Sequence, residues 1–273
     1  MLSQIVSGGQ TGADRAALDV AIKFNIPHGG WITKGRRTED GTLPGVYQLQ
    51  EMTTSDYPSR TRQNIIGSQG TAIISRGPLR GGSKLTWSFA RVKGKPVSHI
   101  DLLDNDIFES AIILQSFILE NQIKTLNVAG PRASHDPGIY FDVKSILEAV
   151  LYLDYLESDK ETKFSPLFPK TTDTFCYGGT IDGAARLICH HLPLRAKSVV
   201  ARLPDDEIGD LYFAWMDALR TCLGLEEDRE GLVSGLAKKA VQGNVFTVED
   251  AIMEILKSVK KQLTATCRLR IVQ

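Results

Sequence analysis

The sequence predicts an α/β fold in which a doubly wound, mainly parallel, five-stranded sheet is followed by a second, smaller all-α domain. Three observations predict it. Short apolar runs alternate with helical stretches through the first half of the chain, which is typical of a parallel sheet covered by helices on both faces. Glycine-rich turns follow two of these apolar runs. The second half of the chain shows helical patterns only.

The strands expected in the first half are short and apolar, and helices or long loops separate them. The first helix should end near Asn25, because Pro27 disfavours helical backbone in the residue before it. Asp104 or Asn105 is suited to cap the fourth helix. The expected strands are Gln4–Ser7, His28–Ile32, Thr71–Ser75, Val97–Ile100 and Thr125–Ala129. The expected helices are Ala13–Phe24, Ser59–Ser68, Ser83–Lys93, Asn105–Asn121 and Ile139–Leu156.

The composition changes after Leu156, where periodicity is lost and lysine, proline and threonine become frequent. This change predicts a boundary between two domains. We expect an α/β domain over 1–157, a linker over 158–174 and a helical domain over 175–273. The helices expected in the last domain are Asp182–His191, Leu194–Leu203, Asp205–Leu223, Glu227–Val241 and Val248–Leu263.

The overall composition is that of a globular protein, and it argues against two classes of partner. Of the 273 residues, 42% are hydrophobic and 23% are charged, and 32 basic side chains balance 32 acidic ones. A non-specific nucleic-acid binder usually carries a basic excess, so we expect no nucleic-acid partner. The apolar stretch Ser110–Leu119 is too short to span a bilayer, so we expect no membrane partner.

Two features predict a cytoplasmic protein. The chain begins almost directly with a core strand, which leaves no room for a targeting peptide. The cysteines all lie in the second half and form no CxxC pair, so we interpret them as reduced thiols. They are Cys176, Cys189, Cys222 and Cys267.

Two glycine-rich turns carry the functional signal. The first, 7–15, follows an apolar strand and opens a helix, and the second, 80–86, has the same placement. A strand, a glycine turn and a helix N-terminus together present backbone N–H groups to an anion. Glycine lets the backbone approach a phosphate closely. Two such turns in one sheet predict a phosphorylated small ligand.

Further polar elements are expected at the same edge of the sheet. Arg60 and Asn64 lie one helical turn apart and can face one site, and the Arg36–Arg37 loop adds positive charge. Either glycine turn alone could be only a tight connection. Asp14 could bind a ribose or a pterin, or it could favour the dipole of the first helix. The candidate binding residues are Gly8, Gly9, Gln10, Thr11, Gly12, Asp14, Arg60, Asn64, Arg80, Gly81, Gly82, Ser83, Lys84, Thr86, Gly130 and Arg132.

Motifs for demanding chemistry are scarce. No HxxxH, CxxC or paired-carboxylate motif stands beside the glycine turns, so a metal held by the protein is not expected. The first turn also differs from the GxGxxG and GxxxxGK[ST] fingerprints. The catalytic residues, if there are any, are not identified.

These same residues resemble the molybdenum-carrier family, a branch of the Rossmann-like superfamily that also includes Lonely-Guy-type phosphoribohydrolases. The resemblance runs through most of the first domain. Its motifs are SGGQTGADRAALD (7–19), GRRTEDG (35–41), YPSRTRQN (57–64), GPLRGGSKLT (77–86), KPVSHID (95–101) and NVAGPRAS (127–134). It implies a Rossmann-like domain, homo-oligomeric assembly through that domain, and binding of molybdenum cofactor, a pterin that carries a phosphate (molybdopterin).

The comparison with the phosphoribohydrolases bears on catalysis. Their PGGxGTxxE signature ends in a glutamate that serves glycosidic cleavage, whereas Ser88 or Phe89 stands at that place here. The leading hypothesis is therefore a carrier that binds a phosphorylated pterin or nucleotide. One alternative is a nucleoside-phosphate N-glycosidic hydrolase that uses a carboxylate such as Asp14 or Glu39. Another is a nucleotide sensor that controls the helical domain.

Overall fold

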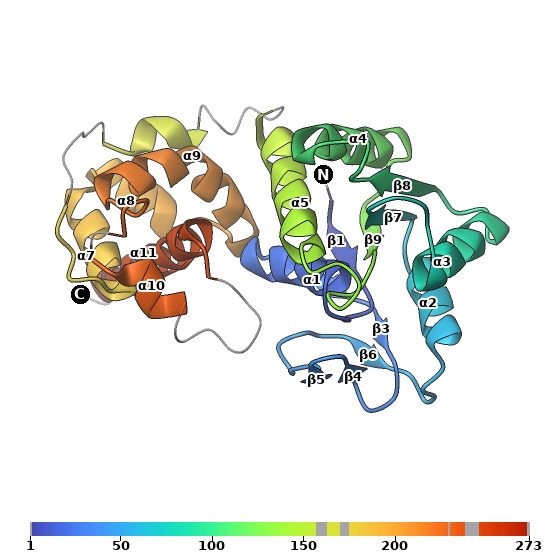
Figure 1. Ribbon diagram of the computed structural model, residues 1–273. Coiled ribbons are helices and arrows are strands. Elements are labelled where there is room, and N and C mark those ends of the chain that lie inside the picture. The colour runs from blue at the N-terminus through green and yellow to red at the C-terminus, as the bar shows by residue number, and fades with distance from the viewer. Residues whose placement is uncertain (1, 157–162, 170–174, 229, 238–245, 272–273) are drawn as a thin grey trace. The chain divides into compact units, whose positions relative to one another are not determined.

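A computed structural model describes residues 2–156, 163–169, 175–228, 230–237 and 246–271 (Figure 1). The chain divides into two compact units, Met1–Asp154 and Tyr155–Gln273. The first unit is an α/β sandwich and the second is built from helices. This arrangement confirms the predicted fold class.

The first unit is built on a five-stranded sheet in which all strand pairs are parallel. Its strand order is β2-β1-β9-β7-β8, so the strand that comes last in the sequence, β9, lies in the middle of the sheet. The sheet core is mainly apolar, because Ile73, Ile74, Leu126 and Val128 are each 0% exposed. The strand bounds are β1 Gln4–Val6, β2 His28–Gly29, β7 Gly70–Ser75, β8 Val97–Asp101 and β9 Thr125–Ala129.

Helices cover both faces of this sheet. The chain runs from β1 to β2 in one direction along the sheet and from β7 to β8 in the other. Because such crossovers are right-handed, the helices that make them, α1 and α3, cover opposite faces. Helix α2 packs against α3. The helix bounds are α1 Ala13–Lys23, α2 Tyr57–Ile66, α3 Gly81–Val92, α4 Ile107–Glu120 and α5 Ile139–Leu156.

The expected strand His28–Ile32 is wrong as a single strand. It breaks at Gly30, whose φ is +121° and where a Cβ would stand 2.1 Å from the carbonyl oxygen of Ser7. Only the first part joins the main sheet. The second part, β3 (Trp31–Ile32), pairs with β6 (Gln50–Glu51), and a separate hairpin joins β4 (Arg37–Thr38) to β5 (Gly41–Thr42).

The expected cap of the fourth helix is also displaced. Asp106, and not Asp104 or Asn105, caps α4. Its carboxylate accepts from the Glu109 amide, and the Glu109 side chain accepts from the Asp106 amide, which completes a capping box. The preceding Asn105 instead donates its side-chain amide to the Asp101 carbonyl.

The second unit gathers its helices around α11, which packs against α7, α8 and α9. Trp215 is fully buried and donates its indole N–H to the Phe164 carbonyl at 3.0 Å. Phe164 falls in the segment expected as a linker, of which 163–169 is described and packs into this unit. The bounds are η1 Ser165–Leu167, α7 Ile181–His191, α8 Leu194–Ala201, η2 Asp205–Glu207, α9 Ile208–Cys222, α10 Leu232–Ala237 and α11 Val248–Ile271.

Three helical expectations in this unit need correction. The helix expected over Val248–Leu263 continues to Ile271. The single helix expected over Asp205–Leu223 is a 3-10 turn followed by α9. Of the helix expected over Glu227–Val241, the structure describes a helix only at Leu232–Ala237, and 238–241 lies outside the described residues. No helix within the described ranges combines the length and apolarity needed to cross a bilayer.

Candidate functional site

The first glycine turn connects β1 to α1 at the carboxyl end of the sheet. Gly9 and Gly12 have φ values of +74° and +79°, a conformation that favours glycine. A Cβ on Gly12 would stand 2.6 Å from the Pro131 carbonyl oxygen, so the loop after β9 closes directly over this turn. The turn therefore depends on glycine both for its backbone conformation and for close packing.

Most donors of the first turn are engaged within the chain. The Gln10 amide donates to Asp14 Oδ2 at 3.4 Å, and the Thr11 amide donates to Gln10 Oε1 at 3.3 Å. The Ala13 amide donates to the Pro131 carbonyl at 3.3 Å. An anion could reach these three N–H groups only by replacing the chain's own acceptors.

Asp14 and Arg60 form an ion pair beside this turn. Arg60 Nη2 lies 2.8 Å from Asp14 Oδ2, and the two side chains are only 13% and 9% exposed. The guanidinium fills the space above Gly8, where a Cβ would stand 1.5 Å from Nη2. In this structure the Asp14 carboxylate therefore accepts hydrogen bonds from Arg60 and from the Gln10 amide.

Asn64 lies one turn after Arg60 on α2 and is buried. Its side chain accepts from the Trp31 amide at 2.6 Å and donates to the Trp31 carbonyl at 3.2 Å. These two hydrogen bonds satisfy the backbone N–H and C=O of Trp31 as a neighbouring strand would. The observed role of Asn64 is thus to position the segment after Gly30.

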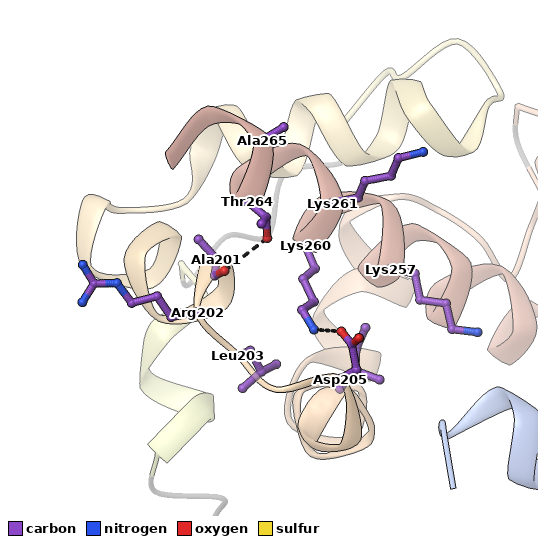
Figure 2. Close-up of a pocket in the computed structure, with 10 residues that line it drawn as sticks. Ala201, Arg202, Leu203, Asp205, Lys257, Lys260, Lys261, Thr264 and Ala265 are labelled. Carbon is purple, nitrogen blue, oxygen red and sulfur yellow. Dashed lines mark hydrogen bonds and ion pairs between the residues drawn. The ribbon is translucent and has the colours of Figure 1, made fainter. Parts of the chain in front are cut away.

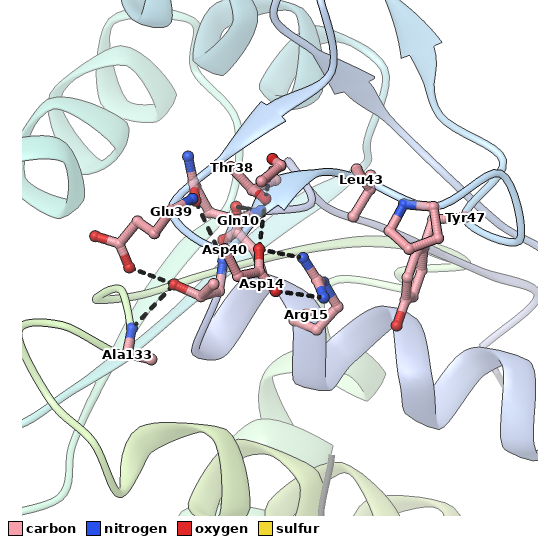
Figure 3. A network of polar contacts seen from close by, with 12 residues as sticks. Gln10, Asp14, Arg15, Thr38, Glu39, Asp40, Leu43, Tyr47 and Ala133 are labelled. Carbon is pink, nitrogen blue, oxygen red and sulfur yellow. Dashed lines mark hydrogen bonds and ion pairs between the residues drawn. The ribbon is translucent and has the colours of Figure 1, made fainter. Parts of the chain in front are cut away.

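The tip of the β4–β5 hairpin lies against the first turn (Figure 3). Glu39 accepts from the Thr11 hydroxyl at 2.5 Å and from the Ser134 hydroxyl at 2.5 Å. Its backbone amide donates to Gln10 Oε1 at 3.1 Å. The next residue, Asp40, binds the Arg15 guanidinium through both carboxylate oxygens, at 3.2 and 3.3 Å.

These contacts keep the Glu39 carboxylate ionised. Partial burial by itself raises the pKa of Glu39. The hydrogen bonds from Ser134 and Thr11 and the charge of Arg132 outweigh this effect, so the net pKa lies below the ordinary value. Glu39 is therefore an anion at neutral pH.

The loop after β9 forms the floor between the two glycine turns. A Cβ on Gly130 would stand 2.4 Å from the Ile74 carbonyl oxygen and 2.6 Å from the Ala13 side chain, so only glycine fits there. Arg132 stacks over the Tyr57 ring at 5.2 Å and lies 3.7 Å from Glu39 Oε1. The positive charge of Arg132 therefore lies beside the first glycine turn.

The second glycine turn has a different environment because it is open. Helix α3 begins at Gly81, and its N-cap residue, Arg80, makes no side-chain capping bond. Gly81 and Gly82 are exposed, and a Cβ on either would meet no atom within 4 Å. The Thr86 hydroxyl donates to the Gly82 carbonyl at 2.9 Å. The half-buried Ser83 and the exposed Lys84 complete this first helical turn.

Both turns lie at the carboxyl edge of one parallel sheet. Strand β9 separates β1 from β7, so the turns follow strands two spacings apart, which is roughly 10 Å. The helices that follow the two turns cover opposite faces of the sheet. The end of β9 therefore lies at the switch point, where the order of the strands reverses. In doubly wound folds, ligands bind in the crevice at this place.

The residues that cover the first turn were not predicted from the sequence. Tyr57, Asp40 and Ser134 were not expected to contribute, and Glu39 was considered only as an alternative carboxylate. Arg36 was expected to add charge, but its guanidinium donates to the carbonyls of Leu43, Pro44, Tyr47 and Leu49. The Thr38–Gly41 sequence, with a turn-forming Asp-Gly pair, was the available signal for a hairpin.

The second unit has an open depression of about 540 Å³ between η2, α8 and α11 (Figure 2). Its one inward-pointing lysine, Lys260, pairs with Asp205, while Lys261 and Arg202 extend outward. The charge of Lys260 is therefore used within the chain. Across the part of the chain that the structure describes, no three His, Cys, Asp or Glu side chains are grouped so that they could bind a metal ion.

Comparisons with known proteins concern the first unit. A model of the circularly permutated YpsA SLOG family matches residues 5–151. A crystal structure named "Putative molybdenum carrier protein", from Syntrophus aciditrophicus SB, is 53% identical with a TM-score of 0.54. The match covers 55% of this chain and 95% of that chain. The curated proteins give no match.

Proposed function

The chain belongs to the circularly permutated YpsA SLOG family, and from this membership and the geometry of its sheet edge we propose that it is a molybdenum carrier. In this proposal the first unit binds a phosphorylated pterin, such as molybdopterin, or a nucleotide at the carboxyl edge. The name of the 53% identical structure supports the choice of cargo.

The observation that carries the proposal is the open N-terminus of α3. Its exposed glycines and the absence of a capping bond from Arg80 leave backbone N–H groups accessible to an anion. The helix dipole favours negative charge at this end. Arg80 and Lys84 are exposed on either side and add positive charge. A terminal phosphate would accept hydrogen bonds from these N–H groups, and its negative charge would be stabilised by the helix dipole and by the two basic side chains.

Residues at the first glycine turn suit the remainder of such a ligand. Tyr57 is 41% exposed, and its ring lies against Arg132. An exposed aromatic ring can stack on a flat heterocycle such as a pterin or a nucleobase. Gln10 and Arg132 supply hydrogen-bond donors next to it. The dithiolene of a bound molybdopterin would itself hold the metal, so this assignment requires no metal ligand from the protein.

The test is isothermal titration of the whole chain with molybdenum cofactor, AMP and ADP-ribose. We expect at least one to bind, and we expect Gly82→Ala to weaken that binding about tenfold, because a methyl group would block the open amides. The substitution leaves packing intact, since the added Cβ has open space and alanine favours helix. Gly45→Ala, also exposed and uncrowded, is the matched control.

A second pair of variants tests the charge. Arg80→Gln should weaken binding, whereas Arg91→Gln, at the opposite end of α3, should leave it unchanged. Absence of binding by every ligand, or full affinity in Gly82→Ala, would contradict the proposal. The predicted homo-oligomer, the domain boundaries and the cytoplasmic location stay predictions from the sequence.

One observation favours a second candidate, an N-glycosidic hydrolase. Glu39 places an ionised carboxylate at the outer surface of the site, whereas Asp14 is buried and paired with Arg60. Glu39 is therefore the better placed of the two to stabilise a developing positive charge on a ribose. Incubation with AMP distinguishes the candidates. A carrier releases no adenine, whereas a hydrolase releases adenine and loses this activity in Glu39→Gln.

A further inference from the structure

Three arginine–carboxylate pairs surround the first glycine turn. Arg60 pairs with Asp14 at 2.8 Å, Arg15 with Asp40 at 3.2 Å, and Arg132 with Glu39 at 3.7 Å. The chain therefore supplies one carboxylate for each cation of this region. Two of the three carboxylates come from adjacent residues at the tip of one hairpin.

The Glu39 carboxylate is bound as an external anion would be. Each of its oxygens accepts from a different hydroxyl, Thr11 after β1 and Ser134 after β9, both at 2.5 Å. Arg132 supplies the nearby positive charge. Hydroxyls and a guanidinium are also the groups that bind phosphate, because carboxylate and phosphate oxygens accept the same hydrogen bonds.

Two arginine N–H groups in this region have no hydrogen-bond acceptor among the described residues. Arg15 is only 8% exposed, yet its Nε has no hydrogen-bond partner among the described residues. The Nε of Arg60, on the other side of the turn, is likewise buried without a partner in that part of the chain. Buried unpaired donors are costly and uncommon. A ligand with more acceptor oxygens than a carboxylate could satisfy them.

The tip and the base of the hairpin are held by separate contacts. Strands β4 and β5 have two residues each, and all residues from Glu39 to Thr42 are exposed. The base is fixed separately, because Arg36 binds four carbonyls of the segment from Leu43 to Leu49. Gly41, at the end of the tip, has a φ of +114°. Figure 3 shows that Asp40 contacts Arg15 directly.

We infer that the hairpin tip, Glu39–Asp40, occupies a second anion site at the first glycine turn, and that a phosphate-class anion enters this site by displacing the two carboxylates. The inference rests on the proposed function and deepens it, because it adds a second anion site at the same sheet edge, roughly 10 Å from the start of α3. Displacement would expose Arg15 and Arg132 to the ligand and leave the Asp14–Arg60 pair in place.

The test is titration of the whole chain with inorganic pyrophosphate. The Glu39→Gln/Asp40→Asn variant should bind pyrophosphate about tenfold more tightly than the wild type, since two competing charges have been removed. The control, Asp104→Asn/Glu120→Gln, removes two exposed carboxylates elsewhere in the first unit and should match the wild type. A hairpin variant that binds within twofold of the wild type, or more weakly, overturns the inference.

Gly82→Ala separates this inference from the proposed function. If it weakens pyrophosphate binding while the hairpin variant shows no gain, the α3 site stands and the second site fails. If the hairpin variant gains affinity and Gly82→Ala has no effect, the second site stands and the α3 site fails. Absence of binding by all variants overturns both.

Hydrogen exchange on the wild type gives a readout that needs no substitution. Saturating pyrophosphate should accelerate exchange of the amides from Thr38 to Gly41, because the Glu39 amide loses its bond to Gln10. Unchanged exchange in the bound state overturns the inference.

Discussion

The guanidinium of Arg60 lies where the side chain of any residue other than glycine at position 8 would stand. A Cβ on Gly8 would be 1.5 Å from Arg60 Nη2 and 1.7 Å from Cζ. The absence of a side chain at Gly8 therefore permits the buried pair between Arg60 and Asp14. The glycines of this turn therefore leave space for an internal ion pair and also allow the backbone conformation of the turn.

Gly8→Ala should destabilise the protein by about 3 kcal/mol, because displacing Arg60 leaves the buried Asp14 carboxylate without its partner. The free energy of unfolding in urea measures this. Gly45→Ala, with open space around its Cβ, should change the stability by less than about 1 kcal/mol. Equal stabilities for the two variants would contradict the proposed role of Gly8.

Arg36→Lys should destabilise the β4–β5 region even though it preserves the charge. A lysine ammonium cannot reproduce the planar fork that binds four carbonyls between Leu43 and Leu49. We expect a loss of about 2 kcal/mol in the free energy of unfolding and faster proteolysis within 36–49. Arg37→Lys is the matched control, since Arg37 is exposed. Proteolysis at the same rate in both variants would show that Arg36 does not hold the loop.

The contacts of Glu39 predict a specific titration. Its folded-state pKa lies below 4.5, so its bonds to Thr11 and Ser134 favour the closed hairpin at neutral pH and are lost as the pH falls through that lower value. The carboxyl carbon resonance of Glu39 should titrate with a midpoint below 4.5. In Ser134→Ala the midpoint should rise toward 4.5. A wild-type midpoint at or above 4.5 would exclude an anion held by these donors.

The central sheet could be predicted from sequence because its signals are local. Each buried parallel strand is a short apolar run, and residues such as Ile73 and Ile74 face packed layers on both sides. Helix α5 was predicted with its observed bounds, Ile139–Leu156. The break at Gly30 could not be predicted in this way, because it depends on the close approach of Ser7 from another strand.

The candidate site was predicted less completely for a similar reason. Glycine turns and strand ends are visible in the sequence, so the elements at the carboxyl edge could be named. The hydrogen-bond partners of the arginines could not be predicted from the sequence. Arg36 binds carbonyls and Arg60 binds Asp14 through contacts that depend on the folded loops. The covering hairpin was also missed, since β4 and β5 are too short to give a periodic signal.

The central position of β9 has a consequence for how the protein is made. Strands β1 and β7 both pair with β9 and not with each other, so neither completes its ladder until Thr125–Ala129 has been synthesised. A nascent chain that ends before this segment exposes two apolar strand edges at once. The first unit therefore depends on late, long-range closure, and a ribosome that stalls before residue 125 leaves a chain prone to aggregate.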